Sequence, residues 1–130
     1  MTVPMRNKVD FQWMLSDSPF GYGEKGTQKI DETDDSHVHG DTRGFTIPAS
    51  QTDYELDLTD IVTAGAMLFI RADRECGIKL NSDAASLITL KQLQTNGYAY
   101  FFVTADVTKV YVTTGSNDTK LSLSVTGDTV

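Results

Sequence analysis

Residues 64–81 read AGAMLFIRADRECGIKLN, and this stretch decides the fold class. The apolar run at 67–70 is too short for a helix and too rich in large side chains for a loop, so it predicts a strand buried on both faces. The charged residues 71–75 then predict a tight polar corner. Beyond the corner, apolar and polar residues alternate in IKLN at 78–81, which is the period-two pattern of a strand with one face inward.

The chain after residue 50 repeats this alternation between turn signals. The signals recur at a spacing of roughly 8 to 12 residues, as in a sandwich or jelly roll, and they separate about seven short strands. One of them, Asn96-Gly97, is a strong signal for a two-residue hairpin. No stretch has a convincing helical period. We therefore predict an all-β fold, an antiparallel β-sandwich or jelly-roll-like domain over residues 51–130, with an extended N-terminal arm.

The alternation also predicts which side chains form the core. The run YAYFFV at 98–103 is apolar on both faces, which predicts a central or covered strand. Over the whole domain, the predicted core residues are Leu56, Leu58, Leu68, Ile70, Ile78, Leu80, Phe102, Val110, Val112, Leu121, Leu123 and Val125.

Length, charge and cysteine usage narrow the class of protein. At 130 residues the chain suits a single domain that buries roughly two-thirds of the surface its unfolded form exposes. Eleven basic against eighteen acidic residues give a net charge of -7, which argues against nucleic acid as a partner, because such binders gain affinity from Lys and Arg contacts to phosphate. The single Cys76 cannot form an internal disulfide and is expected to be a small, half-buried thiol. No segment approaches the roughly 18 apolar residues of a membrane span, so neither a membrane partner nor an export signal is expected.

Residues 1–50 differ in composition from the rest, because they hold both histidines, all three prolines and half of the glycines. We interpret them as an extended N-terminal arm and a polar loop. A strand-like stripe at 9–15, followed by the segment FGYG at 20–23, carries the aromatic residues of the arm. The stripe either pairs with an edge of the chain's own sheet or docks on a neighbouring subunit by strand addition. The predicted interface residues of the arm are Val9, Phe11, Trp13, Leu15, Phe20 and Tyr22.

His37-Val38-His39 is the constellation with metal-ligand character, since side chains at i and i+2 of an extended segment project to the same side. The pair resembles the His-x-His of small-barrel metalloenzymes of the cupin kind, but the Glu that should follow is missing and there is no third histidine. A trimer that pools three pairs around one axis is an alternative. Two solvated histidines in the acidic loop DETDDSHVHGD at 31–41 are the favoured interpretation. We therefore predict no metal and no cofactor, with His37 and His39 as weak metal candidates.

Catalytic motifs are missing from the sequence. There is no Gly-rich phosphate loop, no nucleophile elbow and no Cys-x-x-Cys. The candidates for a calcium site are Asp34-Asp35, Asp57 and Asp60, but DETDDSHVHGD at 31–41 lacks the loop periodicity that such a site needs, and a solvated charge run is favoured. We therefore do not expect an enzyme and name no catalytic residue.

Three segments of the domain carry a family resemblance: LDLTDIVTAGAMLFIRAD at 56–73, CGIKLN at 76–81 and VTKVYVTTGSNDTKLSLSVTGD at 107–128. With its G-x-x-L-x-I-R and V-x-x-V-Y-V-T strands, this part of the chain resembles small β-sandwich structural proteins of tailed-phage virions. The resemblance covers about the last 75 residues and implies a non-enzymatic virion component, above all a capsid decoration (cement) protein that stabilises the capsid lattice.

The resemblance also implies partners and location. These are the major capsid protein or other virion proteins, a homo-oligomer in which a trimer is favoured, and a place in the virion after assembly in the host cytoplasm. The alternatives are a neck, tail or fibre component, including a glycan-binding module in which Trp13, or Tyr98 and Tyr100, stack on sugar rings.

Overall fold

The computed structural model describes residues 5–15, 24–34, 39–92 and 94–128, with side chains described from residue 40 onward. These residues form ten strands and no helix, which confirms the all-β prediction. The strands are β1 (Met5–Leu15), β2 (Glu24–Asp34), β3 (His39–Ile47), β4 (Tyr54–Asp57), β5 (Gly65–Ala72), β6 (Cys76–Leu80), β7 (Ile88–Leu90), β8 (Ala99–Val103), β9 (Lys109–Thr113) and β10 (Thr119–Gly127).

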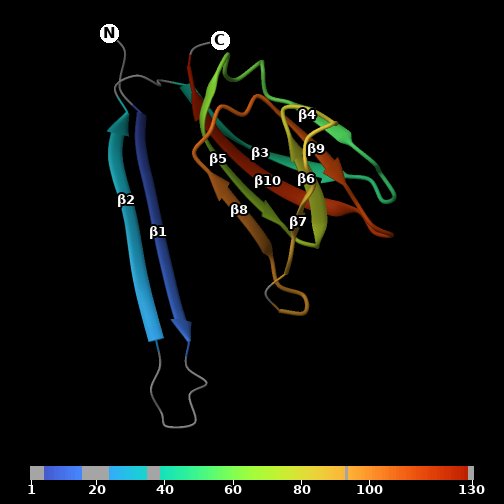
Figure 1. The fold of residues 1–130 in the computed structure, drawn as a ribbon, viewed down its shortest axis with the longest axis horizontal. Helices are drawn as coiled ribbons and strands as arrows, with labels where there is room; N and C mark the ends of the chain where they lie inside the picture. Colours follow the sequence, from blue (N-terminus) through green and yellow to red (C-terminus); the bar gives the residue numbers. More distant parts are fainter. Residues whose placement is uncertain (1–4, 16–23, 35–38, 93, 129–130) are drawn as a thin grey trace.

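Eight of the strands form the predicted antiparallel sandwich. One sheet has the strand order β3-β10-β5-β8 and the other has the order β4-β9-β6-β7. Figure 1 shows them as two layers, and the buried side chains of both sheets form one hydrophobic core. The core lies between the layers because each strand turns alternate residues toward the other sheet.

In the first sheet, β10 is an inner strand paired on both sides. All nine of its residues pair with β3, from Thr119 opposite Ile47 to Gly127 opposite His39, and the opposite edge of β10 pairs with β5. Its apolar residues Leu121, Leu123 and Val125 are at most 2% exposed. The residues between them are serines, which the pleat places on the outer face of the sheet.

Ten of the twelve predicted core residues are at most 4% exposed, so the core prediction is largely confirmed. Leu80 is partly buried and packs against the core. Phe102 was predicted wrongly, because the register opposes it to Phe69 on the outer face while its neighbour Phe101 packs inward. The core also contains apolar residues that the alternation did not predict: Ile47, Ile61, Val62, Ala72, Cys76, Leu90, Ala99 and Val107.

Two strand assignments also differ from expectation. The strand predicted from YAYFFV to be central or covered is β8, which lies at the edge of its sheet. The turn at Asn96-Gly97 connects β7 to β8, and because these strands belong to different sheets it is a crossover and not a hairpin within one sheet. Asn96 does adopt the positive φ of 64° that favours Asn in turns.

The segment predicted as an arm contributes β3 to the sandwich, so the sandwich begins before residue 51. Phe45 and Ile47 pack inward from this edge strand. The alternate residues Thr42, Gly44 and Thr46 are exposed. β3 resembles a loop in sequence because an edge strand with one solvated face needs few apolar residues.

The remaining strands, β1 and β2, form a two-stranded antiparallel hairpin with a sheet of its own (Figure 1). Eleven pairs join them in continuous register, from Met5 opposite Asp34 to Leu15 opposite Glu24. The predicted stripe at 9–15 is therefore a strand, but its partner is β2 rather than a sandwich edge. β2 was not predicted, since EKGTQKIDETD has almost no apolar residues, and its last residues were assigned to a polar loop.

Replacing Leu123 by Ala should destabilise the domain by about 2–5 kcal/mol, because the side chain is fully buried on an inner strand and its loss leaves a cavity. Ser122→Ala, one residue away on the outer face, should change stability by no more than about 0.5 kcal/mol. Urea unfolding followed by circular dichroism measures both changes. Equal costs for the two variants would contradict the assignment of faces on β10.

Candidate functional site

The outer face of the sheet β3-β10-β5-β8 carries a cluster of aromatic side chains. We call it the aromatic face and define it as Phe69, Arg71, Tyr98, Tyr100 and Phe102. Phe69 and Arg71 point outward because they alternate on β5 with Leu68, Ile70 and Ala72, which are fully buried. The ladder then opposes Arg71 to Tyr100 and Phe69 to Phe102 across β5 and β8.

Two tyrosines of this face are open to solvent. Tyr98 is 46% exposed and Tyr100 is 51% exposed, and the two rings lie together and not singly, which is the pattern that marks a contact surface. The Tyr98 and Tyr100 ring centroids lie 6.4 Å apart with a tilt of 55°, and those of Phe69 and Tyr100 lie 6.3 Å apart with a tilt of 37°. The three rings therefore form a continuous row within the favourable range of aromatic pairs.

The guanidinium of Arg71 supports one end of the row. Its Cζ lies 4.7 Å from the centroid of the Tyr98 ring, which is cation–π geometry. Tyr98 precedes β8 and has no ladder partner among the described pairs. The contact with Arg71 therefore orders a ring that is otherwise half open to water.

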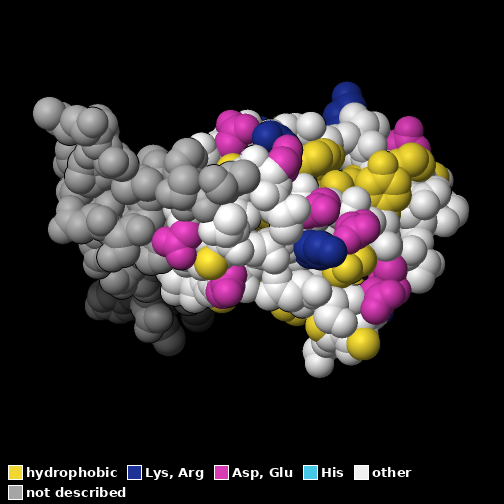
Figure 2. Space-filling view, turned by 90° about the horizontal axis from the view of Figure 1, so that it is seen from above, with side chains coloured by type: hydrophobic (Ala, Val, Ile, Leu, Met, Phe, Trp, Pro, Cys, Tyr) yellow, Lys and Arg dark blue, Asp and Glu magenta, His cyan; other side chains and the backbone are white. Residues whose placement is uncertain are grey.

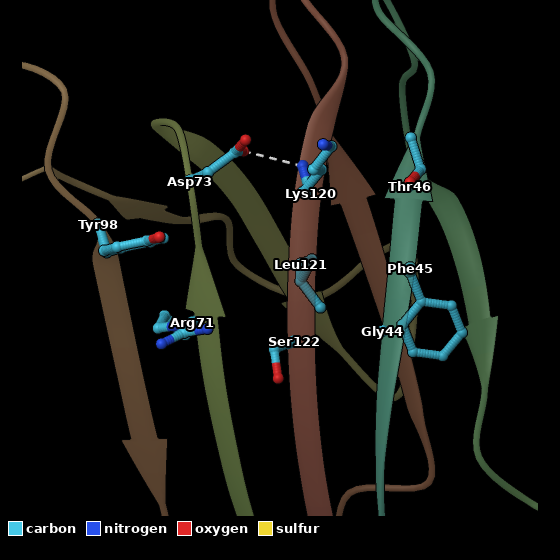
Figure 3. Close-up of a pocket in the computed structure, with 9 residues that line it drawn as sticks. All are labelled: Gly44, Phe45, Thr46, Arg71, Asp73, Tyr98, Lys120, Leu121 and Ser122. Carbon is cyan, nitrogen blue, oxygen red and sulfur yellow. Dashed lines mark hydrogen bonds between the residues drawn. The ribbon is translucent and has the colours of Figure 1, made fainter.

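A hollow adjoins the row at the end of the sheet where β5 and β3 finish and β10 and β8 begin. It has a volume of about 520 Å³ and is open to solvent. Figure 3 shows that its lining comes from β3, β5 and β10, together with Asp73 just after β5 and Tyr98 just before β8. The lining residues are Gly44, Phe45, Thr46, Arg71, Asp73, Tyr98, Lys120, Leu121 and Ser122.

Backbone hydrogen bonds fix the polar rim of the hollow. Asp73 Oδ1 accepts a 2.8 Å bond from the Lys120 amide, as Figure 3 shows, and the Asp73 amide donates to the Lys120 carbonyl at 3.0 Å. The Gln92 side-chain amide donates to the carbonyls of Asp73 at 3.0 Å and of Gly97 at 2.7 Å. Gln92 therefore ties the loop before Tyr98 to the corner after β5, so that both sides of the hollow are held together.

The outer face of the other sheet has a different character, because charged side chains pair across it. Lys109 Nζ lies 3.3 Å from Glu55, and Lys79 Nζ lies 3.0 Å from Asp53. The hydrogen bond with Glu55 raises the pKa of Lys109 above its ordinary value. The Lys109–Glu55 pair is exposed and contributes little to stability, whereas the side chains of Lys79 and Asp53 are only 20% and 26% exposed. Figure 2 likewise shows acidic side chains scattered over the face seen from above, as the net charge of -7 requires.

Two of the aspartates considered for calcium, Asp57 and Asp60, have structural partners. Asp57 accepts bonds from the Thr59 hydroxyl at 2.6 Å and from the Thr59 amide at 3.0 Å, and these bonds lower the pKa of Asp57. Asp60 pairs with Arg43 at 2.7 Å. Within 39–92 and 94–128 and the two described hairpin strands, no group of three His, Cys, Asp or Glu side chains is placed to hold a metal ion.

The predicted interface and metal residues fall outside the part of the chain whose side chains are described. Four of them, Val9, Phe11, Trp13 and Leu15, lie on β1, and His39 begins β3. Phe20, Tyr22 and His37 lie outside the described residues altogether. Among the described residues there is no helix long and apolar enough to span a membrane.

The aromatic face was only partly visible in the sequence. Tyr98 and Tyr100 were named there as sugar-stacking candidates within the alternative of a glycan-binding module, although their strand was predicted to be central or covered. Arg71 and Asp73 were assigned to a polar corner, and Lys120 was not considered. These residues come together only through strand register, which no local pattern encodes.

Cys76 is 4% exposed, and its thiol should be unreactive in the folded protein. Burial raises its pKa to about 11, with a smaller contribution from the nearby carboxylates of Asp73 and Glu75. At pH 8, iodoacetamide should therefore modify the native chain at least about tenfold more slowly than the urea-unfolded chain. Between pH 9.0 and about 11 the unfolded thiol loses its proton while the folded one keeps it, so this group also lowers stability as pH rises.

Mass spectrometry of alkylated protein measures the rate of modification. The matched control moves the thiol to an exposed loop by combining Cys76→Ala with Ser116→Cys, and this variant should react at similar rates in both states. Rapid alkylation of native Cys76 would contradict the placement of the thiol in the core.

No protein-family model, curated protein or solved structure matches this chain. Its function has therefore to be inferred from its own residues.

Proposed function

We propose that the chain is a non-enzymatic structural component of a virion, and specifically a capsid decoration protein that binds the capsid lattice and stabilises it. The observation that supports this role is the β1–β2 hairpin, whose eleven-pair ladder forms a sheet separate from both sheets of the sandwich. A neck, tail or fibre component is the alternative within the same class.

A two-stranded ribbon needs a surface to be stable. In water an isolated hairpin is marginal, and three or more strands or a packing surface are needed for independent stability. In the described ladders β1 and β2 each have one partner strand, so each offers an edge for strand addition by another chain. A virion component that ties neighbouring subunits together requires such an element.

The sandwich supplies the complementary property, which is a body with a hydrophobic core between its own two sheets. The described core is drawn from residues 47–125, and all of its members lie in the two four-stranded sheets or in the loops between them. Folding and assembly are then carried by different parts of one chain. Repetition over a lattice multiplies contacts that are individually weak.

Gradient-purified viral particles should contain the chain, and a labelled antibody should decorate the capsid shell at regular spacing under the electron microscope. This is the result expected of a decoration protein, since every capsid facet offers the same binding site. Label confined to the tail or neck would favour the alternative assignment. Absence of the chain from intact particles would contradict the virion role.

Breaking the hairpin should abolish self-association and leave the sandwich folded. The double variant Thr27→Pro/Gln28→Pro removes a ladder donor in the middle of β2, because the N–H groups of successive strand residues point to opposite edges and one of these two faces β1. By light scattering the wild-type chain should be a trimer and the variant a monomer, while both unfold cooperatively in urea. Loss of the cooperative transition would mean that the hairpin belongs to the domain's own fold, and an unchanged trimer would remove the hairpin from assembly.

A further inference from the structure

We propose that the aromatic face and the adjoining hollow bind a neutral oligosaccharide, with pyranose rings stacked on Tyr98 and Tyr100 and their hydroxyl groups held by the polar rim. The inference rests on the geometry of this one sheet face and does not depend on the virion role. Tyr98 and Tyr100 are the most exposed aromatic side chains among the described residues, and they lie next to each other.

The chemistry of a sugar matches that of the row. A pyranose has an apolar C–H face and a rim of hydroxyl groups, and a tyrosine offers a flat apolar ring with a polar end at a low cost in conformational entropy. The rings of Tyr98, Tyr100 and Phe69 follow one another at 6.4 and 6.3 Å. A row of this kind suits a chain of sugar rings better than a single ring.

The row is pre-organised for a ligand. Arg71 holds Tyr98 by the 4.7 Å cation–π contact, and Gln92 holds the loop before Tyr98 through bonds to Gly97 and Asp73. Little ordering is then required on binding, which leaves more of the stacking energy for affinity.

The hollow supplies the hydrogen-bonding part of the site. Its volume of about 520 Å³ lies within the roughly 300–1,000 Å³ of small-molecule sites. Asp73, Lys120 and Ser122 line it, and a carboxylate has capacity for hydrogen bonds beyond the one that Asp73 accepts from the Lys120 amide. No atom lies within 4 Å of the position that a Cβ would take at Gly44, so the glycine leaves this part of the hollow open.

The composition of the face favours a sugar over other partners. Nucleic acid needs several phosphate contacts, whereas the hollow has two cationic residues beside one carboxylate and the chain as a whole carries a charge of -7. Aromatic residues and Arg are also enriched in the cores of protein interfaces, but the apolar part of this sheet face is confined to the aromatic row. Beside the aromatic row, the outward residues of β3 and β10 are Lys120 and a set of small, mostly hydroxylated residues: Thr42, Gly44, Thr46, Ser122 and Ser124.

The test is an array of neutral oligosaccharides that includes cellohexaose, maltohexaose, chitohexaose and mannohexaose, with oligogalacturonate as the acidic comparison, followed by calorimetry of the full chain with each binder. At least one neutral hexasaccharide should bind. Tyr98→Ala and Tyr100→Ala should each weaken that binding on the order of tenfold, as for the loss of one stacked ring. Tyr54→Ala removes a tyrosine that is 38% exposed on the opposite sheet, and it should leave the affinity unchanged.

A second variant tests the hollow without removing an aromatic ring. Gly44→Val places a branched side chain in open space on an edge strand, so the fold should tolerate it while sugar binding falls on the order of tenfold. Three outcomes overturn the proposal: no neutral oligosaccharide binds, only oligogalacturonate binds, or the affinity is the same in Tyr98→Ala and in Tyr54→Ala. Loss of self-association rather than of sugar binding in Tyr98→Ala would also overturn it, because the face would then be a protein contact.

Discussion

The double pairing of β10 is the constraint on which the rest of the sandwich depends. This strand lies between β3 and β5, and its register with both sets which residues of the sheet point inward. Because side chains alternate strictly along a strand, burying Leu121, Leu123 and Val125 fixes the outward positions as well. The same register that builds the core therefore brings Gly44, Ser122 and Arg71 into one row on the outside. The hollow is a geometric consequence of the core.

The two outer faces of the sandwich cover the same core but carry different kinds of side chain. On the sheet around β9, charged side chains cover the surface and pair with one another at 3.0 to 3.3 Å. On the sheet around β10 the outward positions hold hydroxyl groups, a glycine, half-exposed rings and the cationic side chains of Arg71 and Lys120. Exposed rings contribute nothing to the core and forgo the benefit of burial, about 1.5–3 kcal/mol for a large side chain. An asymmetry of this kind is better explained by a contact made on the aromatic face than by stability.

Much of the fold could be predicted from the sequence because alternation is a local signal. The strands β5, β6, β9 and β10 show it clearly, and their inward residues are the buried ones. The prediction of strands and core residues failed where the local sequence fits more than one structure equally well. Phe101 and Phe102 are adjacent and equally apolar, so only pairing with β5 decides which of them faces the core. β3 and β2 are polar enough to resemble loops, and their strand character comes from the long ladders that they join.

The candidate site was less predictable for the same reason. Tyr98 and Tyr100 could be identified as large rings with a possible contact role, but Arg71, Asp73 and Lys120 are distant in sequence from them and from Gly44. Their proximity follows from the order β3-β10-β5-β8, in which no two neighbouring strands are consecutive in the chain. A site assembled across such an order leaves no motif of fixed spacing in the sequence.

The hairpin and the aromatic face lie on different elements of the chain, and this separation has a consequence for affinity. A single shallow face that stacks two rings and makes a few hydrogen bonds binds a sugar weakly, because most of the stacking energy offsets the loss of freedom on binding. In an oligomer held together through the hairpins, several copies of the face meet one multivalent glycan surface. Linked sites of this kind exceed the affinity of one site by roughly 10²–10⁴ without any new contact, provided that the geometry lets them engage together. Assembly through one element would thus make weak recognition through the other effective.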